Sequence, residues 1–326
     1  MATYKEIFGT NIEVVSSDPA NPVLGQVWYN TTTEVVKGLG FSTAAWATGG
    51  SLNLARRSSS GAGTNNTNSL VFLGRGEPPL PKTANTESYN GTSWTEVNNL
   101  GTARYGAGSA GASNTSALGF GGYITGGGGY STGTESWNGT NWTGVNSLNV
   151  AKNNGAGAGT ATSALFLMGY PSPGFVETWN GTNWTETTDL NSARSYGAAI
   201  GISNTAVIAV GGSPVVALTE SWNGSSWTEV GDLNTGRDMA SSGGTHTDAV
   251  IFGGNAPALT GATETWNGTS WTSTTSMATA RASMARGGPM GTSISAIAAG
   301  GSPPSGTTAT EEWTGAAQTT VTFTDS

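Results

Sequence analysis

Glutamate and basic residues recur at equivalent places along the chain, and such side chains carry out acid–base chemistry in enzymes. The glutamates are Glu87, Glu135, Glu177, Glu220, Glu264 and Glu311. The basic residues are Arg56, Arg104, Lys152, Arg194, Arg237 and Arg281. A glycosidase needs two carboxyl groups whose environments move their pKa values apart, whereas six equivalent carboxylates share one environment. The pattern therefore predicts a structural girdle of six ion pairs; the alternative is unpaired, solvated charge.

Other residues with catalytic chemistry are few. The chain has no Cys and one His, His246, in the polar stretch GGTHTDAV. A Ser-His-Asp triad would have to use this histidine, and a triad is recognised by geometry rather than by composition. Without Cys there is neither a disulfide framework nor a thiolate nucleophile. We therefore expect a protein that is not an enzyme and that uses no metal or other cofactor.

The charge balance narrows the expected partners. The 326 residues include 12 Lys and Arg against 20 Asp and Glu, which gives a net charge of -8. An acidic chain is poorly suited to a phosphate backbone, so nucleic acid is not expected as a partner. No apolar run approaches the roughly 20 residues of a membrane helix, so membrane insertion is not expected either.

A repeat with a mean period of 45 residues sets the positions of the charges. It is marked by Trp46, Trp94, Trp142, Trp184, Trp227 and Trp271. Leu or Met follows each Trp after six residues, and the basic residue follows after ten. Further on come an apolar run that ends in Gly, such as VIAVGG at 207–212, and then the Glu of the next hairpin.

Five of the hairpins contain an Asn-Gly pair, as in WNGTNW at 137–142. The stretch Asn138-Gly139-Thr140 matches the acceptor pattern for N-glycosylation. Asn-Gly is also the strongest short signal for a type I′ turn, in which both central residues have positive φ. Because the stretch recurs with the repeat, we interpret it as a hairpin tip.

A period of 40 to 50 residues with four strand-like segments is typical of a β-propeller blade. The first segment of a repeat is almost free of bulky side chains, as in RYGAGSAG at 104–111, which suits strands crowded around a central axis. The second segment is apolar, and the third and fourth carry aromatic residues on one sheet face. The sequence therefore predicts an all-β propeller.

The order of basic residue, apolar run, Gly-Gly, Glu, aromatic residue and Trp resembles the kelch repeat of galactose-oxidase-like propellers over residues 41–326. The stretches PVLGQVWYNTTTEVVKG and TESYNGTSWTEV are similar to those of virion proteins of tailed bacteriophages, especially phages of marine bacteria. The resemblance implies a tail-fibre-like or decoration component. Galactose-oxidase activity needs several His ligands and a Cys-linked Tyr, which this composition does not supply.

The last repeat lacks its second Trp, since Gln318 stands there, while Phe41 and Trp46 precede the first complete repeat. We predict that the strand with Trp46 joins the last repeat and closes a six-bladed ring that has no open edges. The alternative is a seventh blade built from QVWYN, EVVKG, Trp46 and TTVTFT. Residues 1–40 then form an N-terminal attachment segment with a hairpin at Trp28 to Lys37, and residues 41–326 form the propeller.

The loops between the second and third segments vary, whereas the connection from Trp to Arg is constant. Variable loops on a rigid scaffold commonly carry binding sites. Tyr123, Tyr130, Tyr170 and Phe175 lie in these loops and are candidates for stacking on sugar rings or for anchoring a protein partner. The alternative is packing of these rings against the blades.

By resemblance, residues 1–40 would attach the propeller to other virion proteins, and the propeller would bind host-surface polysaccharide or decorate the particle. The first residues, MATYKEIFGT, lack the apolar region of a secretory signal. This fits assembly in the host cytoplasm and localisation in the virion. The alternative function is an intracellular kelch-type scaffold for protein interactions.

Overall fold

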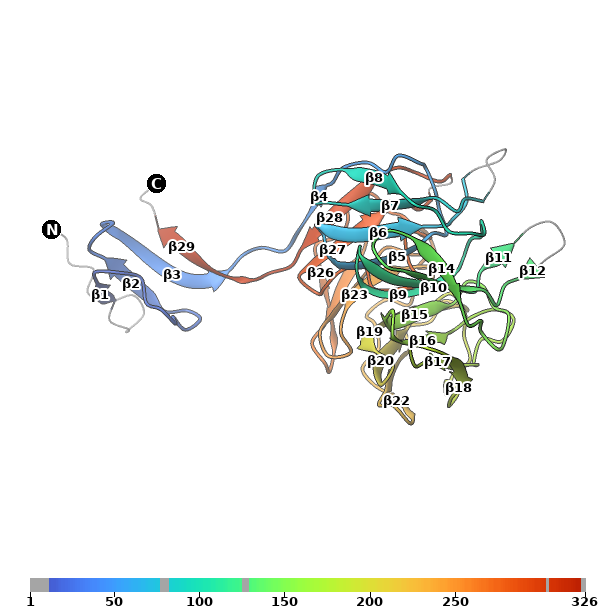
Figure 1. The fold of residues 1–326 in the computed structure, drawn as a ribbon. Coiled ribbons are helices and arrows are strands. Elements are labelled where there is room, and N and C mark those ends of the chain that lie inside the picture. The colour runs from blue at the N-terminus through green and yellow to red at the C-terminus, as the bar shows by residue number, and fades with distance from the viewer. Residues whose placement is uncertain (1–11, 77–81, 125–128, 303–304, 324–326) are drawn as a thin grey trace. The chain divides into compact units, whose positions relative to one another are not determined.

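The computed structural model describes residues 12–76, 82–124, 129–302 and 305–323. Within these ranges the regular elements are all β-strands, and no helix is present that could cross a membrane. The chain divides into two compact units, one of Met1–Ala44 with Gly315–Ser326 and the other of Ala45–Thr314 (Figure 1).

The larger unit contains five four-stranded antiparallel sheets in the described residues, each hydrogen-bonded in chain order. The first two sheets contain β5 (Ser60–Asn65), β6 (Asn68–Phe72), β7 (Thr86–Tyr89) and β8 (Trp94–Val97), then β9 (Gly108–Ser113), β10 (Ser116–Phe120), β13 (Thr134–Trp137) and β14 (Trp142–Val145). The next two contain β15 (Ala156–Thr160), β16 (Ser163–Leu167), β17 (Glu177–Trp179) and β18 (Trp184–Glu186), then β19 (Ala198–Ser203), β20 (Ala206–Val210), β21 (Thr219–Trp222) and β22 (Trp227–Glu229). The fifth contains β23 (Ser241–Gly244), β24 (Ala249–Phe252), β25 (Thr263–Trp266) and β26 (Trp271–Thr274). A small ladder of β11 (Tyr123–Ile124) and β12 (Gly129–Tyr130) extends from the second sheet.

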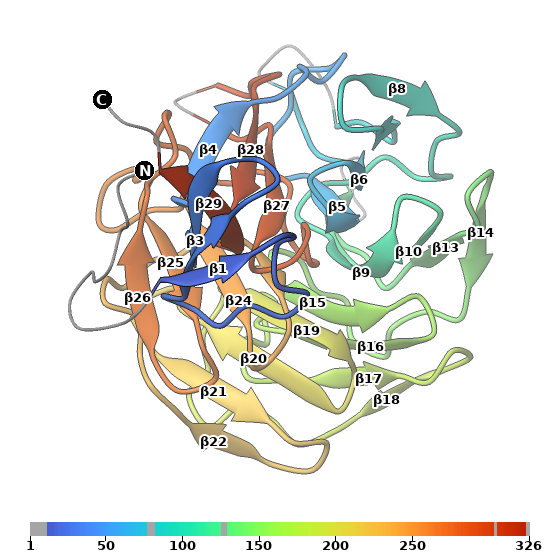
Figure 2. The same cartoon turned by 90° about the vertical axis from the view of Figure 1, so that its left-hand side faces the viewer.

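A further sheet joins the two ends of this unit. It consists of β27 (Ser295–Ala299), β28 (Thr310–Thr314) and β4 (Ala45–Thr48), and Trp46 lies opposite Trp313 in the ladder. The predicted pairing of the Trp46 strand with the last repeat is confirmed. The innermost strands contact one another in a cycle, from β5 through β9, β15, β19, β23 and β27 back to β5. Figure 2 shows the sheets around a common centre, an all-β arrangement consistent with a β-propeller.

Side chains explain this order of strands. The second strands are rich in apolar residues and are buried beyond their first residue, as in AVIAV of β20, whereas β5 has the sequence SGAGTN. The paired Trp rings of the third and fourth strands lie 5.2 to 5.5 Å apart between centroids in four sheets. The second Trp also ties its sheet to the preceding one. In five cases its Nε1 donates to a Thr that stands just before the Glu, as from Trp142 to Thr86 at 3.0 Å, whereas Trp227 donates to the backbone oxygen of Thr188 at 3.0 Å. Trp46 donates in the same way to Thr263 at 3.0 Å.

The Asn-Gly pairs form hairpin tips, as predicted, but the expected type I′ geometry is wrong. Trp137 pairs with Trp142, so the loop has four residues, and φ is positive at Gly139 (92°) but not at Asn138. The Asn138 Oδ1 atom accepts hydrogen bonds from the N–H groups of Thr140 and Asn141, both at 2.9 Å. Because the side chain satisfies two backbone donors, a single left-handed residue is enough for the turn.

The smaller unit is one sheet of β1 (Glu13–Val15), β2 (Val27–Asn30), β3 (Val35–Phe41) and β29 (Gln318–Phe323). The predicted hairpin is confirmed, with Trp28 opposite Lys37. Strand β29 pairs with β3, whereas the sequence analysis assigned residues 41–44 and 315–323 to the propeller. The strands QVWYN, EVVKG and TTVTFT therefore share a sheet, as the seven-blade alternative requires, but Trp46 lies in a different sheet.

Asp18 organises this small sheet. Its carboxylate accepts hydrogen bonds from Lys37 Nζ at 2.7 Å, Asn30 Nδ2 at 2.7 Å and Trp28 Nε1 at 3.0 Å. These donors, Lys37 first, lower the pKa of Asp18 to about 2.

Replacing Trp46 by Ala is expected to destabilise the larger unit by roughly 2 to 4 kcal/mol, since a packed Trp is removed. The substitution loses ring contacts to Phe252 and Trp313, at 4.9 and 5.3 Å between centroids, and the bond to Thr263. Urea denaturation followed by Trp fluorescence measures the change. The control is Phe41→Ala, because this ring is 58% exposed. Equal midpoints for Trp46→Ala and the wild type would contradict a closing role for this strand.

Candidate functional site

The structure brings every one of the six basic residues to its predicted glutamate. Four of the nitrogen–oxygen distances are 3.2 Å (Arg104–Glu135), 3.5 Å (Lys152–Glu177), 2.6 Å (Arg237–Glu264) and 2.9 Å (Arg281–Glu311). Arg56 and Arg194 make the same contact with Glu87 and Glu220. The basic side chains are at most 2% exposed, so these pairs are buried rather than solvated.

Each glutamate also anchors the connection that leads from Trp to the basic residue. Glu177, for example, accepts hydrogen bonds from the backbone N–H groups of Asn149 at 2.8 Å and Val150 at 3.2 Å. The Asn149 side chain donates both to Glu177 and to the backbone oxygen of Trp184. The spacing from Trp to Arg is constant because the loop between them wraps around a glutamate carboxylate and donates hydrogen bonds to it. This role of the glutamates was not predicted from the sequence.

Burial changes the acidity of the basic groups. It lowers the pKa of the guanidinium groups of Arg56, Arg104, Arg237 and Arg281, against the opposing effect of their glutamates. Burial lowers the pKa of Lys152 to about 8, although Glu177 favours its charged form. Breaking such a pair from one side leaves an uncompensated buried charge, which costs about 3 to 5 kcal/mol.

Two residues beyond each basic residue, the backbone turns into a left-handed conformation. The residues are Ser58, Gly106, Asn154, Tyr196, Met239 and Ser283, with φ between 51° and 63°. Their backbones form a closed circuit: each N–H donates to the carbonyl oxygen of the equivalent residue in the preceding sheet, at 2.6 to 3.2 Å, and Ser58 donates to Ser283. The circuit joins the six repeats of the larger unit.

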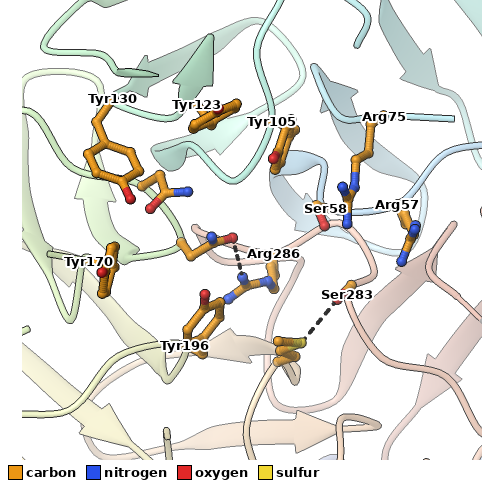
Figure 3. A pocket seen from close by; sticks show the side chains of 13 residues that line it. Arg57, Ser58, Arg75, Tyr105, Tyr123, Tyr130, Tyr170, Tyr196, Ser283 and Arg286 are labelled. Carbon is orange, nitrogen blue, oxygen red and sulfur yellow. Dashed lines mark hydrogen bonds between the residues drawn. The ribbon is translucent and has the colours of Figure 1, made fainter. Parts of the chain in front are cut away.

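A cavity of about 470 Å³ opens at this circuit. Part of its lining comes from the residues just after the basic positions: Arg57, Ser58, Tyr105, Asn153, Asn154, Tyr196, Met239 and Ser283. The other part comes from Arg75, Tyr123, Tyr130 and Tyr170, in the loops that follow the second strands, and from Arg286. Figure 3 shows Tyr130 and Tyr170 on one side, Arg57 and Arg75 on the other, and Arg286 beside Tyr196 between them.

Four of the five tyrosines form a continuous arc. Ring centroids are separated by 5.3 Å between Tyr105 and Tyr123, 5.9 Å between Tyr123 and Tyr130, and 5.7 Å between Tyr130 and Tyr170. The Arg75 guanidinium lies 4.7 Å from the Tyr105 ring centroid and ends the arc. Desolvation and the neighbouring tyrosines raise the pKa of Tyr130, so its hydroxyl is a neutral hydrogen-bonding group at physiological pH.

The candidate residues from the variable loops divide into two groups. Tyr123, Tyr130 and Tyr170 line the cavity, and Tyr170 is 48% exposed. Phe175 is not among the lining residues: its ring lies 4.5 Å from Lys152 Nζ, and its backbone oxygen accepts a hydrogen bond from the same atom at 3.2 Å. Phe175 thus packs against the ion-pair girdle, as the packing alternative required.

The sequence analysis missed Tyr105, Tyr196, Arg57, Arg75 and Arg286 as pocket residues. The signal was present, because Arg57 and Tyr105 directly follow a basic girdle residue and Tyr196 stands two positions after one. Their convergence depends on the left-handed turn, which the sequence pattern does not reveal in non-glycine residues. His246 contributes its backbone oxygen to Trp266 Nε1, and the described residues contain no cluster of three or more potential metal ligands.

Comparison with known proteins gives a fold relationship. The sequence matches no protein-family model and no curated protein. Among solved structures the chain is similar to the structure of YjhT, with a TM-score of 0.61 and 12% identity over 84% of this chain and 99% of that chain. At this level of identity the similarity shows a shared fold alone.

Replacing Lys152 by Arg, the residue of the other five pairs, is expected to alter how stability depends on pH. The pKa of Lys152 falls from 10.5 to about 8 on folding, so the unfolded state binds more protons between these pH values. The free energy of unfolding of the wild type should therefore rise as pH increases from 8 towards 10.5. The variant lacks this contribution, because arginine stays protonated in both states.

Denaturant titrations of both proteins at pH 7.5, 9 and 10 measure this effect. As pH rises, the free energy of unfolding of the wild type should increase relative to that of the variant. Parallel curves for the two proteins would show that the buried amine does not titrate in this range.

Proposed function

We propose that this protein is a non-enzymatic component of a tailed-phage virion, a six-bladed propeller that binds a host-surface glycan in its central pocket. The observation that carries the proposal is the tyrosine arc around a cavity of about 470 Å³. Ligand pockets in proteins commonly measure about 300 to 1,000 Å³.

Three closed cycles support six blades. The innermost strands contact one another in a cycle, the left-handed residues hydrogen-bond in a cycle, and the second Trp of each sheet donates to the preceding sheet. The pair of Trp46 and Trp313 completes the last of these. We infer that the three-stranded sheet is the sixth blade and that β4 is its outer strand.

The chemistry of the pocket suits a sugar. A sugar ring offers apolar C–H faces and many hydroxyl groups, so its binding site needs flat apolar surfaces beside hydrogen-bonding groups. Tyr130 and Tyr170 provide the flat surfaces, and Asn153 and Asn154 provide amide groups. Aromatic rings bury large areas and keep a polar tip, which suits such amphipathic ligands. The lining is therefore equipped for binding by stacking and hydrogen bonding.

The virion part of the proposal rests on the resemblance of the repeats and of residues 22–38 to phage virion proteins. The smaller unit adds support, because it presents large apolar side chains to solvent. They are Val14, Val23, Leu24, Phe41, Val321 and Phe323. Four of them lie on strands of the small sheet, and we propose that other virion proteins cover these exposed side chains.

Replacing Tyr170 by Ala is expected to weaken glycan binding at least about tenfold, a loss of about 1.4 kcal/mol. The labelled full-length chain is applied to an array of bacterial surface polysaccharides, and the affinity for the best ligand is measured by calorimetry. Phe41→Ala, an exposed aromatic outside the pocket, is the matched control and should bind like the wild type. A chain that binds no polysaccharide, or a Tyr170→Ala variant of unchanged affinity, would rule out this pocket as a glycan site.

The virion assignment predicts that the chain is part of purified particles. Particles from cells infected by the phage that encodes the chain are separated on a density gradient and analysed by mass spectrometry. The chain should follow the capsid and tail proteins through the gradient and remain bound in high salt. Recovery of the chain solely in the soluble fraction of the lysate would contradict the assignment.

A further inference from the structure

Arg286 breaks the pattern of small residues around the axis of the larger unit. It stands five residues after Arg281, and the five equivalent positions hold Gly61, Ser109, Gly157, Ala199 and Ser242. The ladders support this equivalence, since Ser60 and Ser241, each one residue earlier, both pair with the last residue of their second strand. One repeat thus carries a long charged side chain where crowding favours the smallest residues.

The backbone around Arg286 explains how the side chain is accommodated. Residues 286–290, the axial segment, leave the pattern of the other repeats and cross to several first strands. The Arg286 N–H donates to the Ser59 oxygen at 3.1 Å, and the Gly287 oxygen accepts from the N–H groups of Ser109 at 2.5 Å and Gly157 at 2.6 Å. A Cβ atom at Gly288 would lie 2.6 Å from the Ser109 backbone oxygen, so the close approach needs glycine. The axial segment therefore fills the centre and presents Arg286 to the cavity.

The guanidinium of Arg286 is buried and incompletely bonded. Arg286 is 5% exposed, and its Nη2 donates a hydrogen bond to Asn154 Oδ1 at 3.3 Å. Within the described residues its Nε and Nη1 atoms have no hydrogen-bond partner. The Tyr196 ring centroid lies 5.9 Å away, and the nearby Asp238 is hydrogen-bonded to Asn255 at 3.0 Å.

This side chain differs from the girdle arginines, each of which meets a carboxylate. A buried charge without a paired anion is costly and needs an explanation. Burial lowers the pKa of Arg286 to about 10, so the group is still protonated at neutral pH. The side chain lines a cavity that also contains Arg57 and Arg75, and in the described part of the chain no Asp or Glu is among the lining residues. The pocket is therefore suited to a negatively charged ligand.

We propose that Arg286 binds the carboxylate of an acidic sugar residue in this pocket, an inference that rests on the proposed glycan-binding function. A guanidinium offers two parallel N–H donors that match the two oxygens of a carboxylate. The sugar ring then lies against the arc of Tyr123, Tyr130 and Tyr170 (Figure 3). The sixth repeat supplies the charge, and the second and third repeats supply the stacking surface.

The experiment compares glucuronate and glucose oligosaccharides of equal length as ligands of the full chain, by calorimetry at neutral pH. The wild type should prefer the glucuronate oligomer at least tenfold. Arg286→Ser, which restores the residue found at Ser109 and Ser242, should lose this preference and keep its weaker affinity for glucose oligomers. Arg286→Lys keeps the charge but not the paired donors and should fall between the two. A circular dichroism spectrum and melting temperature of each variant confirm that it is folded.

Each other outcome overturns a different statement. Equal binding of both oligomers by the wild type, or an unchanged preference in Arg286→Ser and Arg286→Lys, would reject the carboxylate contact and leave glycan binding intact. Binding of inorganic sulfate without a preference for glucuronate would reject the sugar part of the inference. Failure of the wild type to bind any polysaccharide on the array would remove the proposed function itself.

Discussion

A closed circuit of six backbone hydrogen bonds joins the sheets of the larger unit, and the pocket depends on it. The donors and acceptors belong to residues in left-handed conformation, and five of the six are not glycine. A left-handed conformation costs roughly 1 to 2 kcal/mol in a residue with a side chain. The buried ion pairs precede these residues by two positions and hold each chain segment in place. The left-handed conformation directs the neighbouring side chains into a common cavity.

Charged residues are few in this chain, and many of them are buried in the ion-pair girdle. The girdle uses six of the 12 basic residues and six of the 20 acidic ones. Each carboxylate contacts an arginine or lysine and accepts a hydrogen bond from the backbone, and five of the six glutamates are buried. These pairs fix the conformation of the loop, because a shift of the loop would leave a buried charge without its partners.

The residues that line the cavity include several that differ from their equivalents in the other repeats. Where all six repeats agree, as at the Trp, the Glu and the basic residue, the side chains have structural contacts. Where a single repeat departs, as at Arg286 or in the loops with Tyr123, Tyr130 and Tyr170, the side chains line the cavity. Residues that occur in every repeat give a ligand similar surroundings in several orientations, so an asymmetric ligand is oriented by residues that differ between the repeats.

The amino-acid pattern by itself determined the all-β content, the pairing of the Trp46 strand with the last repeat and the partners within the girdle, because these follow from a period that repeats six times. It also pointed to three of the pocket tyrosines, since loop variability is visible along the chain. It led to the wrong turn type at Asn138-Gly139, because the number of loop residues depends on which Trp residues pair. Tyr105, Tyr196 and Arg286 come together only in the tertiary structure. Each lies about 90 residues from the next in sequence, and their meeting depends on left-handed turns and on an axial segment that local propensity does not encode.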